Sequence, residues 1–130
     1  MSPPLILIID ADADSRMIYT ALLESVGYAV AACADGDEAC RLAAQQPPGL
    51  IITELNPGGR DAWSLPRTLA GTTDGPPPPM LLVTADATRR IPECASRAGY
   101  AAWFTKPYDA AHLIDTVRRL LGSPETLAAL

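Results

Sequence analysis

The apolar run from Leu50 to Thr53 places the strongest limit on what this chain can fold into. It combines leucine with β-branched residues, and it is followed by Glu54 and the turn-forming stretch Asn56-Pro57-Gly58-Gly59. A short apolar run without polar alternation is typical of a strand buried on both faces, as in a parallel sheet covered by helices. Functional groups of open parallel sheets gather where the strands end. Glu54, at the end of this predicted strand, is therefore the first candidate functional residue.

Four more apolar runs, separated by helix-like segments, predict the rest of the sheet. The predicted strands are 5–9, 28–33, 50–54, 80–83 and 101–105, and the predicted helices are 14–26, 38–45, 63–69, 88–98 and 109–121. This alternation predicts an α/β fold with a doubly wound, five-stranded parallel sheet in the order 2-1-3-4-5, the flavodoxin-like (βα)5 arrangement. The strand ends would then bring Asp10, Glu54, Thr84 and Lys106 to one edge of the sheet.

Prolines make two of the predicted helices irregular. Asp61 is a candidate cap for the helix around Trp63, but Pro66 indicates that this helix starts late. Pro92 falls near the start of the helix predicted over 88–98, so its first turn is expected to be frayed or displaced. The proline-rich stretch 76–79 is stiff and extended, and we interpret it as a surface loop.

Composition limits the domain count and the function class. A chain of 130 residues forms one domain, which we place at residues 1–122 and follow with a short tail over 123–130. The net charge of -5 argues against direct binding to nucleic acid or to anionic membranes. The N-terminus lacks a basic segment and a long apolar stretch, so we expect a cytoplasmic protein. The three cysteines form no Cys-x-x-Cys pair and are expected to be reduced.

Once these positions are placed, the chain resembles the receiver domain of two-component response regulators over about residues 4–121. Each motif alone is a weak signal, but the five motifs together, in this order and at the strand ends, are specific for this family. The matching pieces are Ile9-Asp10-Ala11-Asp12-Ala13-Asp14-Ser15-Arg16, Glu54-Leu55-Asn56, Thr84-Ala85, Ala98-Gly99 and Phe104-Thr105-Lys106-Pro107-Tyr108.

The resemblance implies a phosphorylation switch. In this family an acidic pair and an aspartate hold a divalent cation with the help of a backbone carbonyl, and that aspartate accepts a phosphoryl group from a histidine kinase. A hydroxyl residue and a lysine then hold the phosphoryl oxygens, and an aromatic residue changes orientation. The matching positions here are Asp10 (acidic pair), Glu54 (phosphoacceptor), Asn56 (carbonyl), Thr84 (hydroxyl), Trp103 (aromatic) and Lys106 (lysine). The same resemblance implies a cis peptide bond before Pro107.

Two departures affect the reaction itself. Ala11 occupies the second acidic position and removes a carboxylate, while the extra methylene of Glu54 fills space that the cation or phosphoryl group would need. Magnesium prefers near-octahedral oxygen ligands, and phosphoryl transfer depends on in-line positioning and on charge neutralisation by the metal. Asp12 belongs to the acidic pocket but is expected to point elsewhere. We therefore expect no metal and no other cofactor, with Asp10, Glu54 and Asn56 as weak metal-ligand candidates.

These observations favour an atypical receiver: a protein-interaction module in signal transduction, and not an enzyme. Its expected partners are a histidine kinase or another receiver, docking through the face made by the fourth helix, fifth strand and fifth helix. One hypothesis is that Glu54 forms an ion pair with Lys106 that imitates part of a phosphorylated or metal-bound state, which makes the domain a constitutive switch. The other is that the pocket is inert, with its charges satisfied by one another and by water. One alternative is a conventional phosphorelay receiver that tolerates both changes. Another is a flavodoxin-like module for a small molecule, although the acidic loop after the first strand would repel a flavin phosphate.

Overall fold

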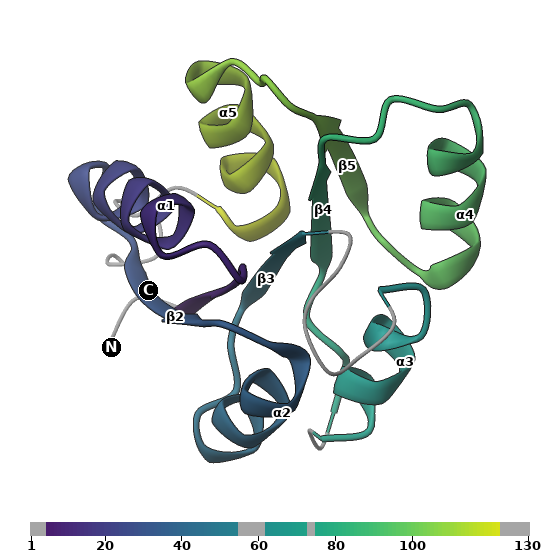
Figure 1. Ribbon diagram of the computed structural model, residues 1–130. Coiled ribbons are helices and arrows are strands. Elements are labelled where there is room, and N and C mark those ends of the chain that lie inside the picture. The colour runs from purple at the N-terminus through teal and green to yellow at the C-terminus, as the bar shows by residue number, and fades with distance from the viewer. Residues whose placement is uncertain (1–4, 55–61, 73–74, 123–130) are drawn as a thin grey trace.

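The computed structural model describes residues 5–54, 62–72 and 75–122, and within them five strands alternate with five helices (Figure 1). The strands are β1 (Leu5–Ile9), β2 (Ala29–Cys33), β3 (Leu50–Glu54), β4 (Met80–Thr84) and β5 (Ala102–Thr105). The helices are α1 (Ala13–Ser25), α2 (Gly36–Gln45), α3 (Leu65–Ala70), α4 (Arg90–Ala98) and α5 (Ala110–Leu121). All strand pairs are parallel and the order is β2-β1-β3-β4-β5, which confirms the predicted flavodoxin-like fold class.

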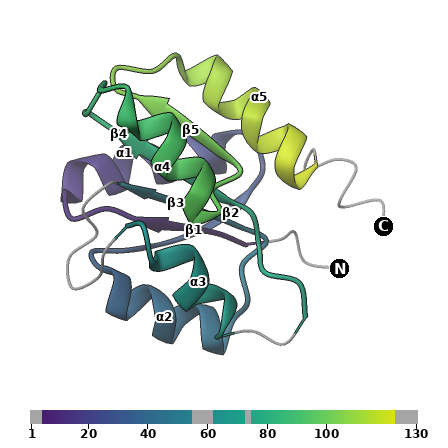
Figure 2. The ribbon, with the colours of Figure 1, turned by 90° about the vertical axis from the view of Figure 1, so that its right-hand side faces the viewer.

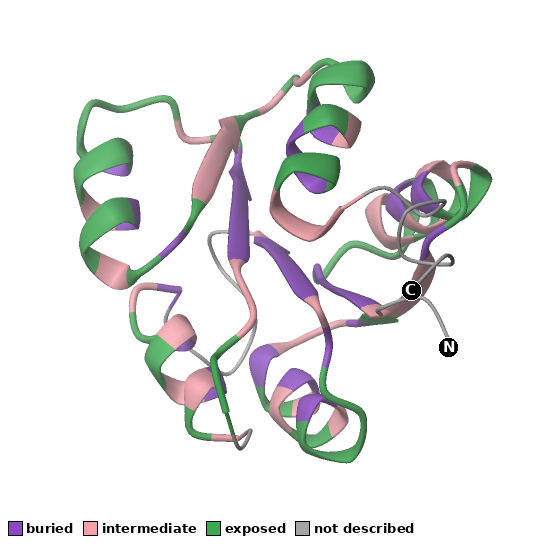
Figure 3. Ribbon diagram, turned by 180° about the vertical axis from the view of Figure 1, so that it is seen from behind, coloured by how far each residue is buried: buried purple, intermediate pink, exposed green. Residues whose placement is uncertain are grey.

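The sheet separates two hydrophobic clusters, because successive residues of a strand point to opposite faces. In β1, Leu7 and Ile9 pack under α2, α3 and α4, whereas Ile6 and Ile8 pack under α1 and α5. Figure 2 shows the helices as layers on the two sides of the sheet, and Figure 3 shows the central strands as buried. Burial on both faces explains why the central strands have no polar alternation in the sequence.

Carboxylate side chains begin three of the helices, and the other two have a proline in their first turn. Asp12, Asp35 and Asp109 cap α1, α2 and α5 by accepting hydrogen bonds from backbone N–H groups. Helix α3 starts late, as predicted, with Pro66 in its first turn, and the expected cap Asp61 lies outside the described residues. Helix α4 is displaced and starts two residues later than predicted. Pro92 falls in its first turn, where a missing N–H costs no helical hydrogen bond.

A long-range hydrogen bond joins the two ends of the described fold. The hydroxyl of Tyr28, just before β2, donates to the carbonyl oxygen of Gly122 at 2.7 Å. Tyr28 is buried beside α1 and α5, so this bond is shielded by the same cluster that holds the helices. The N-terminal half of the sheet and the last helix are thereby tied together.

Candidate functional site

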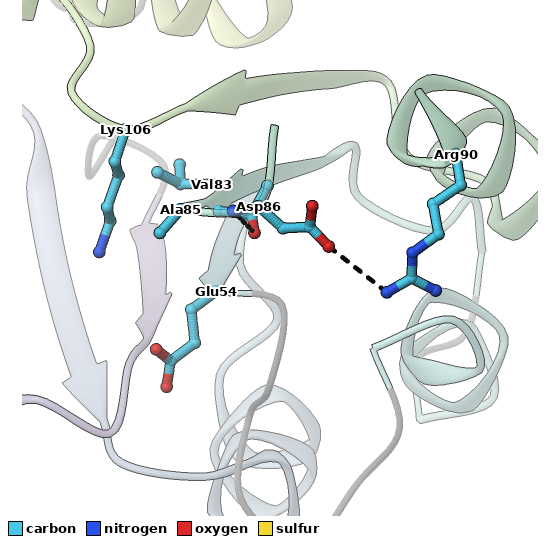
Figure 4. A pocket seen from close by; sticks show the side chains of 7 residues that line it. Glu54, Val83, Ala85, Asp86, Arg90 and Lys106 are labelled. Atoms are coloured by element: carbon cyan, nitrogen blue, oxygen red, sulfur yellow. Dashed lines mark hydrogen bonds and ion pairs between the residues drawn. The ribbon is translucent and has the colours of Figure 1, made fainter. Parts of the chain in front are cut away.

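The carboxyl edge of the sheet brings together the four residues that the sequence placed there. Asp10 follows β1, Glu54 ends β3, Thr84 ends β4 and Lys106 follows β5. A pocket of about 380 Å³ opens at this edge and is lined by Glu54, Thr84 and Lys106, together with residues of β4, of α4 and of the segment between them (Figure 4). The predicted convergence is therefore confirmed.

Asp10 is the buried charge of the site, with 2% of its surface exposed. Its Oδ1 accepts a hydrogen bond from the backbone N–H of Asp12 at 2.9 Å, and its Oδ2 lies 4.0 Å from Lys106 Nζ. The guanidinium of Arg16 donates to the backbone carbonyl of Asp10 at 2.7 Å. A carboxylate removed from water needs a nearby cation and hydrogen-bond donors, and Lys106 and the Asp12 N–H supply them, while Arg16 holds the backbone of Asp10.

Glu54 binds the loop after β1 and does not form the expected ion pair with Lys106. Its Oε1 accepts a hydrogen bond from the backbone N–H of Ala11 at 2.7 Å, while the lysine ammonium lies beside Asp10. Figure 4 shows the Glu54 and Lys106 side chains entering the pocket from different strand ends without meeting. The ion-pair prediction was wrong because the longer glutamate reaches a backbone donor and the buried Asp10 competes for the lysine.

Burial raises the pKa of Glu54, and the neighbouring Asp10 carboxylate acts in the same direction. The Ala11 N–H and the Lys106 charge oppose this rise but do not cancel it. Lys106 is the ion-pair partner of Asp10, and its charge acts on Glu54 without forming an ion pair with it. This arrangement weakly disfavours the ionised form of Glu54 in the folded protein.

Asp86 and Arg90 form an ion pair on one wall of the pocket. The sequence analysis did not predict these two residues as part of the site. Thr84 Oγ1 accepts from the backbone N–H of Asp86 at 3.0 Å, and Asp86 Oδ2 lies 3.4 Å from Arg90 Nη2. A hydrogen bond from the Thr88 N–H holds the pKa of Asp86 below its usual value. Arg90 lines the pocket while 59% of its side-chain surface stays exposed. The four-residue spacing of Asp86 and Arg90 was the available signal.

Three other predicted site residues lie apart from the pocket or outside the described residues. Asp12 is exposed and caps α1 through Ser15, so it points away, as expected. Trp103 is half-buried and packs on the cluster under α2, α3 and α4. Asn56 is outside the described residues. The Lys106-Pro107 peptide bond is cis, as the resemblance implied.

The described donors fit a magnesium ion poorly. Ala11 presents a methyl group, Glu54 is engaged by the Ala11 N–H, and the two Asp10 oxygens face the Asp12 N–H and Lys106. Within the described ranges, no group of three or more His, Cys, Asp or Glu side chains is placed to hold a metal ion. Magnesium needs several well-placed oxygen ligands, so a metal would have to displace existing hydrogen bonds here.

The fold and the site together define a class of protein: single-sheet α/β domains with an acidic pocket, a hydroxyl residue and a lysine at the carboxyl edge. The family model of the response regulator receiver domain matches residues 6–118. The chain therefore belongs to the response regulator receiver family.

Known proteins of this family are similar over nearly the whole chain. Protein PilH of Pseudomonas aeruginosa is 26% identical over 89% of this chain and 96% of its own length. The receiver domain of the sensor histidine kinase PA1611 from the same species, solved with magnesium in its active site cleft, is 28% identical. That comparison covers 94% of this chain and 100% of the other, with a TM-score of 0.82. Vibrio cholerae CheY4 shares the fold with a TM-score of 0.83, at 22% identity over 92% of this chain and 100% of its own. No helix among the described residues is long and apolar enough to span a membrane.

Proposed function

We propose that this chain is an atypical receiver that works as a protein-interaction module in signal transduction without magnesium-dependent aspartyl phosphorylation. The observation that carries this proposal is the 2.7 Å hydrogen bond from the Ala11 N–H to Glu54 Oε1. It joins the loop after β1 directly to the end of β3, the two segments that a metal ion would otherwise link. In the proposed function, this contact between protein groups holds the loop after β1 against β3 in place of a metal ion.

The charge balance of the pocket supports the same proposal. Lys106 and the Asp12 N–H already satisfy Asp10, and Arg16 fixes the backbone of the loop. An attacking carboxylate must be aligned with its phosphodonor, and a metal must neutralise the developing charge. The Glu54 carboxylate is turned toward the Ala11 backbone N–H, so in this position it is not aligned to attack a phosphodonor. We propose that the domain binds no metal or other cofactor during its function and has no catalytic turnover.

The test uses a small acyl phosphodonor with magnesium, with intact mass and tryptophan fluorescence as readouts. For the native chain we expect no gain of a phosphoryl group and no change in fluorescence. The double variant Ala11→Asp/Glu54→Asp restores both carboxylates, and we expect it to respond to magnesium and to gain one phosphoryl group. Repeating the fluorescence in a Trp63→Phe background assigns the signal to Trp103.

Each outcome has a defined meaning. Phosphorylation of native Glu54 would overturn the proposal and favour a conventional phosphorelay receiver, which the retained Thr84 and Lys106 would serve. If the double variant is folded but gains no phosphoryl group, then Ala11 and Glu54 are not the reason why the native chain is not phosphorylated. The single variants Ala11→Asp and Glu54→Asp serve as controls, because each restores one carboxylate.

We further propose that the partner is another protein of a cytoplasmic two-component pathway, either a histidine kinase or a second receiver. The face made by α4, β5 and α5 is the surface that the family resemblance implies for such contacts. Arg118 and Arg119 are exposed on α5, one of the three elements of this face. Charge reversal at both positions should weaken binding to a kinase or receiver partner, measured by titration calorimetry, and unchanged binding would exclude this face.

A further inference from the structure

The outer face of α1 carries an exposed apolar stripe with acidic ends. Met17 and Ile18 are 69% and 62% exposed, and they are the two large hydrophobic side chains found exposed among the described residues. With Asp14, Ala21 and Glu24 they are exposed on one side of the helix, at spacings of three and four residues. Ile18 also borders an apolar hollow of about 430 Å³ beside Tyr108, which extends the apolar surface.

A groove between α3 and α4 has the opposite character. Two adjoining cavities of about 240 and 270 Å³ share Arg67 and Ala98 in their walls. The remaining lining is apolar, apart from Arg97, and includes Pro66 and the half-buried Trp63. None of the described residues that line it is acidic. The groove therefore combines an apolar floor with arginine guanidinium groups.

One of these arginines is available for a partner. Arg97 is paired with Glu93 at 2.7 Å, whereas the Arg67 guanidinium is exposed and has no hydrogen-bond or ion-pair partner within 5–54, 62–72 and 75–122. An unpaired arginine beside an apolar groove is a favourable site for a carboxylate on a docked segment. The chain as a whole has a net charge of -5, whereas the charged residues that line this groove are arginines.

We propose that the α1 stripe of one copy of this chain docks into the α3–α4 groove of a second copy. An amphipathic helix with apolar residues at spacings of three and four fits a hydrophobic groove, and the Asp14 carboxylate at the end of the stripe complements the unpaired Arg67. Figure 1 places α1 and the α3–α4 pair on opposite sides of the molecule. The contact is consequently heterologous: each copy offers one stripe and one groove, so association continues from copy to copy. This inference does not depend on whether Glu54 is phosphorylated.

The first experiment follows the mass of the full chain by analytical ultracentrifugation from micromolar to millimolar concentration. We expect the average mass of the native chain to rise with concentration beyond a dimer. Ile18→Lys disrupts the stripe and Arg67→Glu disrupts the groove, and each should lower the association constant by about tenfold or more. Both positions are exposed, so the variants should stay folded, which circular dichroism checks. Arg41→Glu, on the exposed side of α2, is the matched control and should associate like the native chain.

Mixing the two disrupted variants distinguishes this contact from a symmetric one. The intact groove of the Ile18→Lys chain can accept the intact stripe of the Arg67→Glu chain, so an equimolar mixture should form one-to-one dimers that grow no further. The double variant Asp14→Arg/Arg67→Glu swaps the charges within one chain and should recover part of the association. A native chain that stays monomeric, a mixture that does not pair, or association that depends on Ile18 but not on Arg67 would each overturn the proposal.

Discussion

Replacing Glu54 by glutamine should stabilise the folded protein at neutral pH. The amide oxygen of glutamine can still accept the hydrogen bond from the Ala11 N–H, now 2.7 Å from Glu54 Oε1, while the charge beside Asp10 is removed. Interactions between charges at partly exposed positions are typically worth about 0.2–1 kcal/mol, and the Glu54 side chain is partly exposed. We expect a gain of about 0.5–1 kcal/mol in the free energy of unfolding, or about 2–4 °C in melting temperature.

The pH dependence gives the sign of this effect independently. Because the pKa of Glu54 is raised above its ordinary value of 4.5, the folded state binds the proton more tightly than the unfolded state. The stability that this group contributes therefore falls as the pH rises above 4.5, until the pKa of the folded state is passed. Glutamine does not titrate, so the advantage of Glu54→Gln over the native chain should grow from mildly acidic to neutral pH.

Urea titrations followed by tryptophan fluorescence at several pH values measure this difference. Glu24→Gln, an exposed change on α1, is the control and should alter stability by less than about 0.5 kcal/mol. The electrostatic reasoning would be refuted if Glu54→Gln were less stable than the native chain at neutral pH. A gain that did not vary with pH would refute it equally.

Three further predictions test the packing, a helix cap and a buried thiol. Leu81→Ala should lower the free energy of unfolding by about 2–5 kcal/mol in urea titrations, because the side chain is fully buried in β4. Asp35→Ala removes the carboxylate that accepts from the Glu38 N–H at 2.8 Å and should cost about 1 kcal/mol in the same assay. Burial raises the pKa of Cys33 to about 12, so mass spectrometry should find its maleimide labelling much slower than that of the half-buried Cys94. Equal labelling rates in the folded protein would contradict the burial of Cys33.

The sheet was predictable because its strands are continuous apolar runs. The predicted run 5–9 matches β1, and the other strand bounds differ by one residue at most. The displaced start of helix α4 was expected from Pro92, but the contact behind it was not predictable: Asp86 accepts a hydrogen bond from the Thr88 N–H, which keeps the first predicted residues out of the helix. Such local bonds between side chain and backbone compete with helix formation, and spacing alone does not reveal which one prevails.

The candidate site was predictable in position but not in its contacts. The strand ends were enough to bring Asp10, Glu54, Thr84 and Lys106 to one edge. The partner of Glu54 depends on a side-chain rotamer, which decides between the Ala11 backbone and Lys106, and a sequence specifies no rotamer. The role of a backbone N–H could not be read from the identity of residue 11, since every residue except proline offers one.

The hydrogen bond between Tyr28 and Gly122 has a consequence for how the molecule opens. It connects residues 94 positions apart, so the end of α5 cannot fray without also releasing the segment that leads into β2. Amide protons at both places should then lose their protection against deuterium together, as one cooperative unit. Removing a single phenolic oxygen, as in Tyr28→Phe, would uncouple them.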